Sequence, residues 1–244
     1  MHYRFENAAQ VFELGGEDSA SLPVKELVKG FREGFFAEIP ALVYPADEEK
    51  LRADLLSLKE KGLDTVVCEN VSAVVLAKEL GLKALGGLFL NVTNSEAVRA
   101  YEKLGLSGLT LSMELPLSEI RESLKKTQLK AALAVYGYMP LMKFRNCPKK
   151  AANGDSCKGC SGLSELTDRL GNKFPLICRD KKYSELLNCV PLYTAEKTMP
   201  KGLTELLYFT FESRAQAYDI RNLAKDRKSF AFQKTGGLYH RELL

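Results

Sequence analysis

Short apolar runs alternate with stretches of helical pattern along the middle of the chain. The runs are rich in β-prone residues and begin at Ala41, Thr65, Ala84, Gly108 and Ala131. Between them, apolar side chains recur at helical spacing. This pattern predicts helices over 48–61, 71–80, 95–104 and 117–126. Gly62, Gly81 and Gly105 follow three of these helices, where a left-handed glycine commonly closes a helix.

The alternation of strands and helices predicts a parallel sheet, because each helix returns the chain to lay the next strand beside the last. A sixth unit is predicted over 206–228. Six units fall short of the eight in a complete (β/α) barrel. No Gly-x-Gly-x-x-Gly follows a strand, so dinucleotide binding has no support. We therefore expect an α/β fold of partial TIM-barrel-like (β/α) units, or an open sheet of such units.

The same pattern divides the chain into four segments. Residues 1–40 form a lead segment with a helix predicted over 23–36, and residues 41–145 form half-barrel units. A cysteine-rich module is inserted at 146–193. Residues 194–244 contain the last strand and helix and a basic tail.

Composition places the chain among ordinary globular proteins. It has 244 residues, of which 45% are hydrophobic and 27% charged. No stretch approaches the roughly 20 apolar residues that span a bilayer, and the first residues have no apolar signal core. We expect a cytoplasmic protein without a membrane span. The two histidines, His2 and His240, leave few ways to build a Ser-His or Cys-His hydrolase.

Cysteines provide the strongest chemical signal in the sequence. Five of the six lie in one window, at Cys147, Cys157, Cys160, Cys178 and Cys189. Clustered cysteines in a cytosolic chain indicate metal or redox chemistry. The two-residue spacing of Cys157 and Cys160 lets both thiolates face one ion, and Pro148 follows Cys147 as in many cluster motifs. Four thiolates suit either zinc or an iron–sulfur cluster, and the spacing does not separate the two.

The cysteine window is also basic. Residues 145–182 carry nine Lys and Arg against four Asp and Glu, whereas the whole chain has a net charge of +4. Basic surface beside a metal site attracts an anionic substrate such as RNA. A solvated, lysine-rich loop is the alternative interpretation.

Several ordered motifs together resemble peptidase family U32, the collagenase-like proteins. The resemblance runs from about residue 40 to residue 215. It includes Asn91-x2-Asn94, Leu111-Ser-Met-Glu-Leu115, Tyr136-Gly-Tyr-Met-Pro-Leu-Met142, Asn146-Cys-Pro148, Cys157-x2-Cys160, Leu166-Thr-Asp-Arg-Leu-Gly171, Phe174-Pro175 and Leu187-Asn-Cys-Val-Pro-Leu192.

This resemblance implies a TIM-barrel-like core and, for the better understood relatives, oxygen-independent hydroxylation of an RNA base or an aromatic ring. It implies a 4Fe–4S cluster and prephenate as the oxygen donor. Carried onto this chain, the implied ligands are Cys147, Cys157, Cys160 and Cys178. Cys189 stands where the family usually has serine and is kept as a spare ligand.

Two departures from the family pattern bear on activity. Tyr138 stands where the family has an arginine before Met-Pro-Leu-Met. The chain also matches the second half of the family's barrel, so we expect either a partner subunit that supplies the other half or a reduced relative.

Three polar residues follow predicted strands, where βα folds place their active-site groups. They are Glu69, Asn91 and Glu114. Glu114 is the candidate catalytic residue, because the family pattern includes it, whereas loop or helix-cap roles are favoured for the other two.

Two further functions remain open at this point. One is a zinc-stabilised module that binds RNA or a partner, and the other is the peptidase of the family name, for which His240 is the available imidazole.

Overall fold

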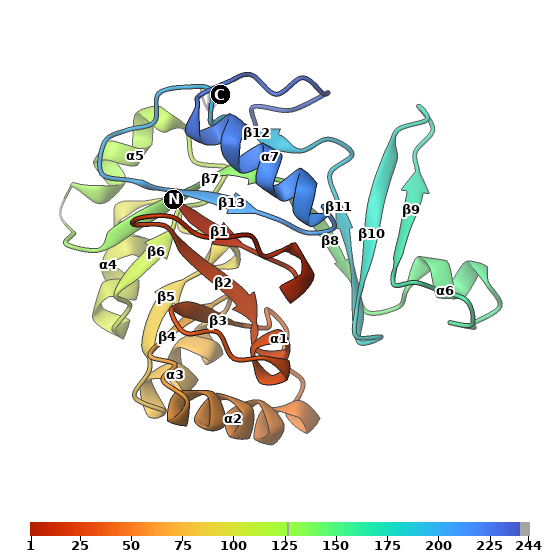
Figure 1. The fold of residues 1–244 in the computed structure, drawn as a ribbon, viewed down its shortest axis with the longest axis horizontal. Helices are drawn as coiled ribbons and strands as arrows, with labels where there is room; N and C mark the ends of the chain where they lie inside the picture. The colour runs from red at the N-terminus through yellow and green to blue at the C-terminus, as the bar shows by residue number, and fades with distance from the viewer. Residues whose placement is uncertain (126, 240–244) are drawn as a thin grey trace.

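The computed structural model describes residues 1–125 and 127–239 of the chain. Eight parallel strands form a barrel (Figure 1). They are β1 (His2–Arg4), β2 (Ser19–Pro23), β3 (Phe35–Ile39), β4 (Thr65–Cys68), β5 (Lys83–Gly86), β6 (Gly108–Thr110), β7 (Lys130–Gly137) and β13 (Thr204–Tyr208). The ring closes because β6 pairs with β7, β7 with β13 and β13 with β1.

Helices cover the outside of the barrel. They are α1 (Val24–Lys29), α2 (Pro45–Glu60), α3 (Val71–Glu79), α4 (Ser95–Leu104), α5 (Leu117–Leu124) and α7 (Arg214–Lys225). Two short 3-10 turns, η1 (Ala8–Gln10) and η2 (Leu88–Leu90), complete the connections. The four helices predicted between 48 and 126 are confirmed. Asn94 caps α4 through its side chain, and Gly105 ends it with φ of 105°.

The α/β, TIM-barrel-like class is confirmed, but the expectation of a partial barrel is wrong. Residues 1–40 supply β1, β2 and β3 rather than a separate lead segment. The helix expected over 23–36 ends at Lys29. The strand expected at Ala41 lies instead at Phe35–Ile39, and the run before Pro45 is the extended approach to α2. The half-barrel that we expected either from a partner subunit or to be lost in a reduced relative is therefore present in this chain.

An insert takes the place of the helix between β7 and β13. It contains β8 (Pro140–Phe144), α6 (Pro148–Ala152), β9 (Leu163–Thr167), β10 (Lys173–Arg179), β11 (Tyr183–Leu187) and β12 (Leu192–Tyr193). Four of these strands form an antiparallel sheet in the order β8-β11-β10-β9, which projects to the right of the barrel in Figure 1. The insert begins with β8, earlier than the expected start at residue 146.

The core lies between the barrel wall and its helices. The outward-facing Tyr3, Leu22 and Val66 are fully buried there. Among the helices that the structure describes, none is long and apolar enough to cross a membrane.

Candidate functional site at the barrel mouth

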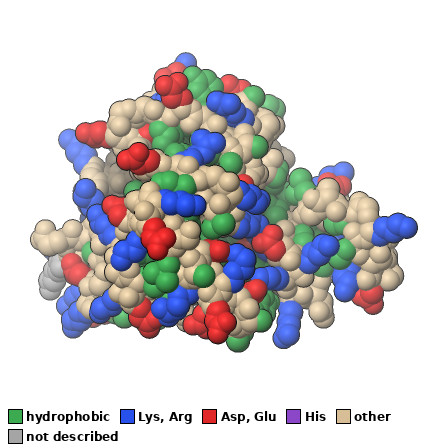
Figure 2. Space-filling model, turned by 60° about the horizontal axis from the view of Figure 1, so that its bottom comes forward, with side chains coloured by type: hydrophobic (Ala, Val, Ile, Leu, Met, Phe, Trp, Pro, Cys, Tyr) green, Lys and Arg blue, Asp and Glu red, His purple; other side chains and the backbone are tan. Residues whose placement is uncertain are grey.

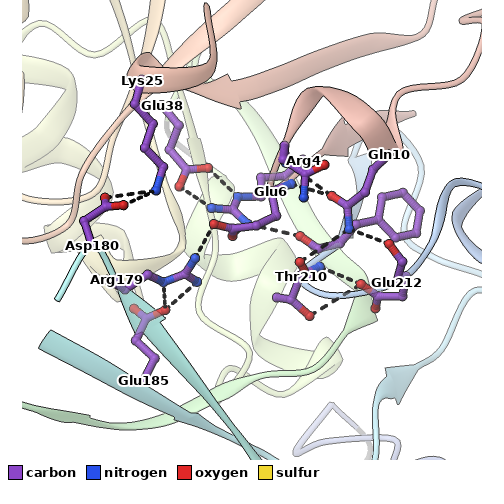
Figure 3. A network of polar contacts seen from close by, with 12 residues as sticks. Arg4, Glu6, Gln10, Lys25, Glu38, Arg179, Asp180, Glu185, Thr210 and Glu212 are labelled. Carbon is purple, nitrogen blue, oxygen red and sulfur yellow. Dashed lines mark hydrogen bonds and ion pairs between the residues drawn. The ribbon is translucent and has the colours of Figure 1, made fainter. Parts of the chain in front are cut away.

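A buried ion-pair network lies at the carboxyl ends of the barrel strands, where β/α barrels build their active sites (Figure 3). Arg4, at the end of β1, contacts both carboxylate oxygens of Glu38 on β3, at 2.6 and 2.8 Å. Its remaining nitrogen donates to Glu6 at 2.6 Å and to the carbonyl of Phe209. Arg4 is 5% exposed, so its bidentate pair with Glu38 is shielded from water. Through these contacts Arg4 joins the ends of β1, β3 and β13.

The insert docks onto the barrel through the same network. Arg179 of β10 pairs with Glu6 of the barrel and, at 2.6 Å, with Glu185 of β11. Burial opposes ionisation of Glu6, but the guanidinium groups of Arg4 and Arg179 hold its pKa below the usual value. Two exposed ion pairs, Lys25–Asp180 and Lys182–Asp47, lie at the edge of this contact.

A cavity of about 220 Å³ lies between the barrel and the β10–β11 hairpin; we call it the mouth pocket. Its floor contains Arg4, Glu38 and Tyr208, and Phe89 and Tyr183 contribute aromatic wall. The pocket therefore combines rings with fixed charges, as sites for small polar molecules do.

Lys143 of β8 lies beside this pocket. Its ammonium nitrogen is 3.4 Å from the centre of the Phe89 ring and 3.6 Å from Glu185. Burial lowers the pKa of Lys143, although Glu185 and Glu69 act in the opposite direction. Lys143 is thus a candidate proton donor or anion-binding group at this mouth.

Glu69, just after β4, is buried and points into the barrel. The amide of Phe89 donates to it at 2.8 Å, and its carboxylate fills the space that a side chain on Gly87 would need. Burial raises the pKa of Glu69 to about 7, and the Glu38 carboxylate acts in the same direction. The helix-cap role that we favoured for this position belongs to Asn70, whose side chain accepts from Ala73.

A raised pKa makes a pH-dependent contribution to stability. The folded chain holds the Glu69 proton until about pH 7, whereas the unfolded chain releases it near its usual value. Raising the pH from 5 to 8 should therefore destabilise the wild type more than Glu69→Gln in urea titrations. Glu60→Gln, at an exposed position, should behave like the wild type. Parallel pH profiles of wild type and Glu69→Gln would contradict this assignment.

Cys178 lies on the other face of the insert. Cys178 is next to Arg179 in β10, and neighbouring residues in a strand point to opposite faces. Because Arg179 faces the mouth pocket, Cys178 faces away from it, together with its cross-strand partner Ser184. Cys178 and the mouth pocket thus lie on the two faces of one hairpin.

Local contacts bring the other three predicted ligands toward Cys178. Gly162 accepts the Cys178 amide at 2.7 Å and donates to the Cys160 sulfur at 3.4 Å. Cys157 is linked to Cys160 through a backbone hydrogen bond. Cys147 precedes α6, and the Ser184 hydroxyl lowers its pKa against the effect of burial. All four predicted ligands therefore lie around one corner of the sheet, which we call the cysteine corner.

The donor set of the cysteine corner fits a metal or cluster in chemistry. Sulfur ligands suit zinc or iron–sulfur groups, and the buried Ser184 hydroxyl lies beside the Cys147 thiol, where it can donate to a thiolate. Among the residues that the structure describes, no three His, Cys, Asp or Glu side chains are already grouped at metal-binding distances. The ligand set therefore stays a prediction.

Other predicted residues lie elsewhere. Glu114 is exposed after β6 and lines neither the mouth pocket nor the barrel interior. Asn91 accepts from Ser112 and ends η2. Cys189 lies beyond the far end of β11, close to Tyr138. His240 falls outside the described residues. No structural finding tests the catalytic role predicted for Glu114.

Comparisons with known proteins identify the family. The sequence profile of peptidase family U32 matches residues 32–159, more than half of the chain. The chain belongs to peptidase family U32. The matched range runs from the approach to β3 to the cysteine corner and ends before Cys160 and Cys178.

Two similar proteins give the extent of this likeness. "Uncharacterized protease MJ0090" of Methanocaldococcus jannaschii is 36% identical over 88 residues, which cover 35% of this chain and 21% of that protein. The chain thus matches about a fifth of the length of that relative. The solved structure of the U32 peptidase Mk0906 aligns with a TM-score of 0.51 at 13% identity, covering 87% of this chain and 93% of that one. At that identity the likeness concerns the fold alone.

Sequence reasoning missed the charged network at the mouth of this U32 barrel. Arg4 and Glu38 lie within short strands where neighbouring residues are apolar, as in Phe35-Phe-Ala-Glu-Ile39. A charge inside an apolar strand was the available signal, because such a charge needs a buried partner.

Proposed function

We propose that this U32 protein is an iron–sulfur-dependent, oxygen-independent hydroxylase that acts on an RNA base or aromatic ring. The observation that carries the proposal is the placement of the cysteine corner and the mouth pocket on opposite faces of the β10–β11 hairpin. A redox group on one face would then lie one sheet thickness from a substrate on the other.

In this proposal Cys147, Cys157, Cys160 and Cys178 hold a 4Fe–4S cluster, which supplies one-electron transfer. Hydroxylation replaces a ring C–H by C–OH, so the ring loses two electrons and an organic oxygen donor gains them. The mouth pocket binds the ring against Phe89 and Tyr183, while Arg179 and Lys143 attract acidic groups. Because the corner faces away from the pocket, a cluster held by these four cysteines would not contact that ring directly.

Positive charge on the insert supports an anionic substrate such as RNA. Lys and Arg outnumber Asp and Glu on the projecting part of the molecule (Figure 2). The exposed basic residues there are Arg145, Lys149, Lys150, Lys158, Arg169, Lys173, Lys181 and Lys182. Such a surface attracts phosphates over long range and loses affinity as salt increases.

Peptidase activity, which the names of relatives imply, has less support in the geometry. A cysteine protease requires an imidazole beside its thiol. The ring of His2 contacts the hydroxyls of Ser19 and Ser21, at 2.8 and 3.0 Å, inside the barrel. Both of its ring nitrogens therefore contact serine hydroxyls rather than a thiol.

Serine substitutions test the ligand set. After anaerobic purification, Cys178→Ser should lose most of the iron, sulfide and visible absorbance of the wild type, whereas Cys189→Ser should retain them. Cys189 is the matched control because it lies at the other end of β11. Full retention in Cys178→Ser, or equal loss in both variants, would contradict the assignment. Zinc without sulfide in the wild type would favour the zinc-stabilised binding module instead.

A further inference from the structure

A second and larger cavity, of about 1160 Å³, occupies the interior of the barrel; we call it the lumen cavity. The interior of a β/α barrel is normally filled by layers of bulky side chains. Here many of the lumen-facing side chains are short. They include Ser19, Ser21, Thr65, Thr110 and Ala132.

Exposure along the strands shows that the lumen cavity is open. Val67 and Leu85 face the lumen and are half-buried, whereas their neighbours Val66 and Ala84 are buried under helices. Lys83 and Lys130, at the amino-terminal ends of their strands, also line the cavity. The lumen cavity therefore opens at the end of the barrel opposite the mouth pocket.

A charged layer separates the two cavities. Arg4, Glu38 and Tyr208 line both the mouth pocket and the lumen cavity. The guanidinium carbon of Arg4 lies 4.5 Å from the centre of the Tyr208 ring, and Glu38 holds Arg4 by two hydrogen bonds. These three side chains therefore form the floor of the mouth pocket and the inner end of the lumen cavity.

Glu69 is the unpaired acid at this inner end. It lines the lumen cavity but not the mouth pocket and is 4% exposed. Within residues 1–125 and 127–239, the amide of Phe89 is its one hydrogen-bond donor and no Lys or Arg forms an ion pair with it. A buried carboxylate with one hydrogen bond is incompletely satisfied, because its two oxygens accept about four.

We propose that the lumen cavity binds a small organic cation, an amine carried on an apolar body, with its nitrogen at Glu69. Phe36, Val67 and Leu85 supply an apolar wall for the body of such a ligand. The charge of Glu38 is already matched by Arg4, so ionised Glu69 leaves the inner end with one excess negative charge. A cationic nitrogen neutralises that charge and supplies the missing donors.

The charged and titratable groups around Glu69 set the pH dependence of binding. Glu38, Arg4, Lys143, Tyr208 and the adjacent Cys68 are close enough to interact with its carboxylate. Burial lowers the pKa of His2 to about 4, so this lumen-facing ring is neutral near pH 7. With a pKa of about 7, Glu69 ionises as the pH rises from 6 to 8. Binding of a cation should therefore tighten about tenfold over that range.

Benzylamine is a suitable probe, with toluene and phenylacetate as analogues that lack the cation. Calorimetry and ligand-observed NMR on the full chain should show saturable benzylamine binding below about 10 mM, the weak-binding range. Affinity should be about tenfold higher at pH 8 than at pH 6. Toluene and phenylacetate should bind at least tenfold more weakly than benzylamine at pH 8. Equal affinity for toluene, or no saturable binding, would overturn the proposal.

Two variants locate the site. Glu69→Gln should abolish the pH dependence, while Glu60→Gln should preserve it. Ala132→Leu should fill the lumen and weaken binding at both pH values, with circular dichroism checking that the variant folds. Unchanged benzylamine affinity in folded Glu69→Gln would overturn the proposal. None of these measurements depends on the cysteine corner, so failure of this proposal is distinguishable from failure of the hydroxylase proposal.

Discussion

Replacing Arg4 with methionine is expected to lower the free energy of unfolding by about 3–5 kcal/mol, the cost of breaking a buried ion pair by removing one partner. The substitution leaves the Glu38 carboxylate, about 8% exposed, without its cation. Glu6 loses one of its two arginine partners. Urea titration of the purified variant measures this loss.

Two further variants isolate the electrostatic cause. Lys25→Met removes the exposed ion pair with Asp180 and should cost less than about 1 kcal/mol. Adding Glu38→Leu to Arg4→Met should restore part of the lost stability, because no uncompensated carboxylate then remains. If the double variant is less stable than Arg4→Met alone, packing rather than charge explains the effect.

Arg179→Met should cost about 3 kcal/mol, the low end for breaking a buried pair, because Arg179 is more exposed than Arg4 and Glu6 keeps its other partner. Glu185 would retain only the longer contact with Lys143 among the described residues. The change breaks the main charged link between the insert and the barrel, so its effect should be local.

Hydrogen exchange measures that local effect. Backbone amides of β10 and β11 should exchange faster in Arg179→Met, whereas those of β3 and β4 should remain protected. Lys182→Met, which removes the exposed pair with Asp47, is the matched control and should leave both regions unchanged. Uniform loss of protection across the barrel would show that Arg179 supports global folding rather than docking of the insert.

Apolar, β-prone runs are the signal by which the sequence predicts strands. β4, β6 and β7 carry such runs and were placed correctly. β1 and β2 were missed because their lumen-facing positions hold His2, Arg4, Ser19 and Ser21. A lumen that is hollow and polar removes the continuous apolar pattern that marks a buried parallel strand. The barrel therefore looked incomplete although all eight strands were present.

The candidate site likewise has a part that the sequence predicts and a part that depends on the folded structure. Clustered cysteines predicted a sulfur site from local sequence, and the family resemblance implied which four of them are ligands; that ligand set stays a prediction. The mouth network was beyond such reasoning, because Arg4, Glu38 and Arg179 are brought together by closure of the barrel and docking of the insert. Glu69 was recognised as a polar residue after a strand, but its burial depends on the neighbouring Gly87 and on the β5–β6 region.

The most direct test of the proposed function is metal and sulfide analysis of the anaerobically purified wild-type chain, with a visible spectrum. The account predicts a brown protein with about four iron and four sulfide ions per chain. A colourless protein that contains zinc and no sulfide would contradict it.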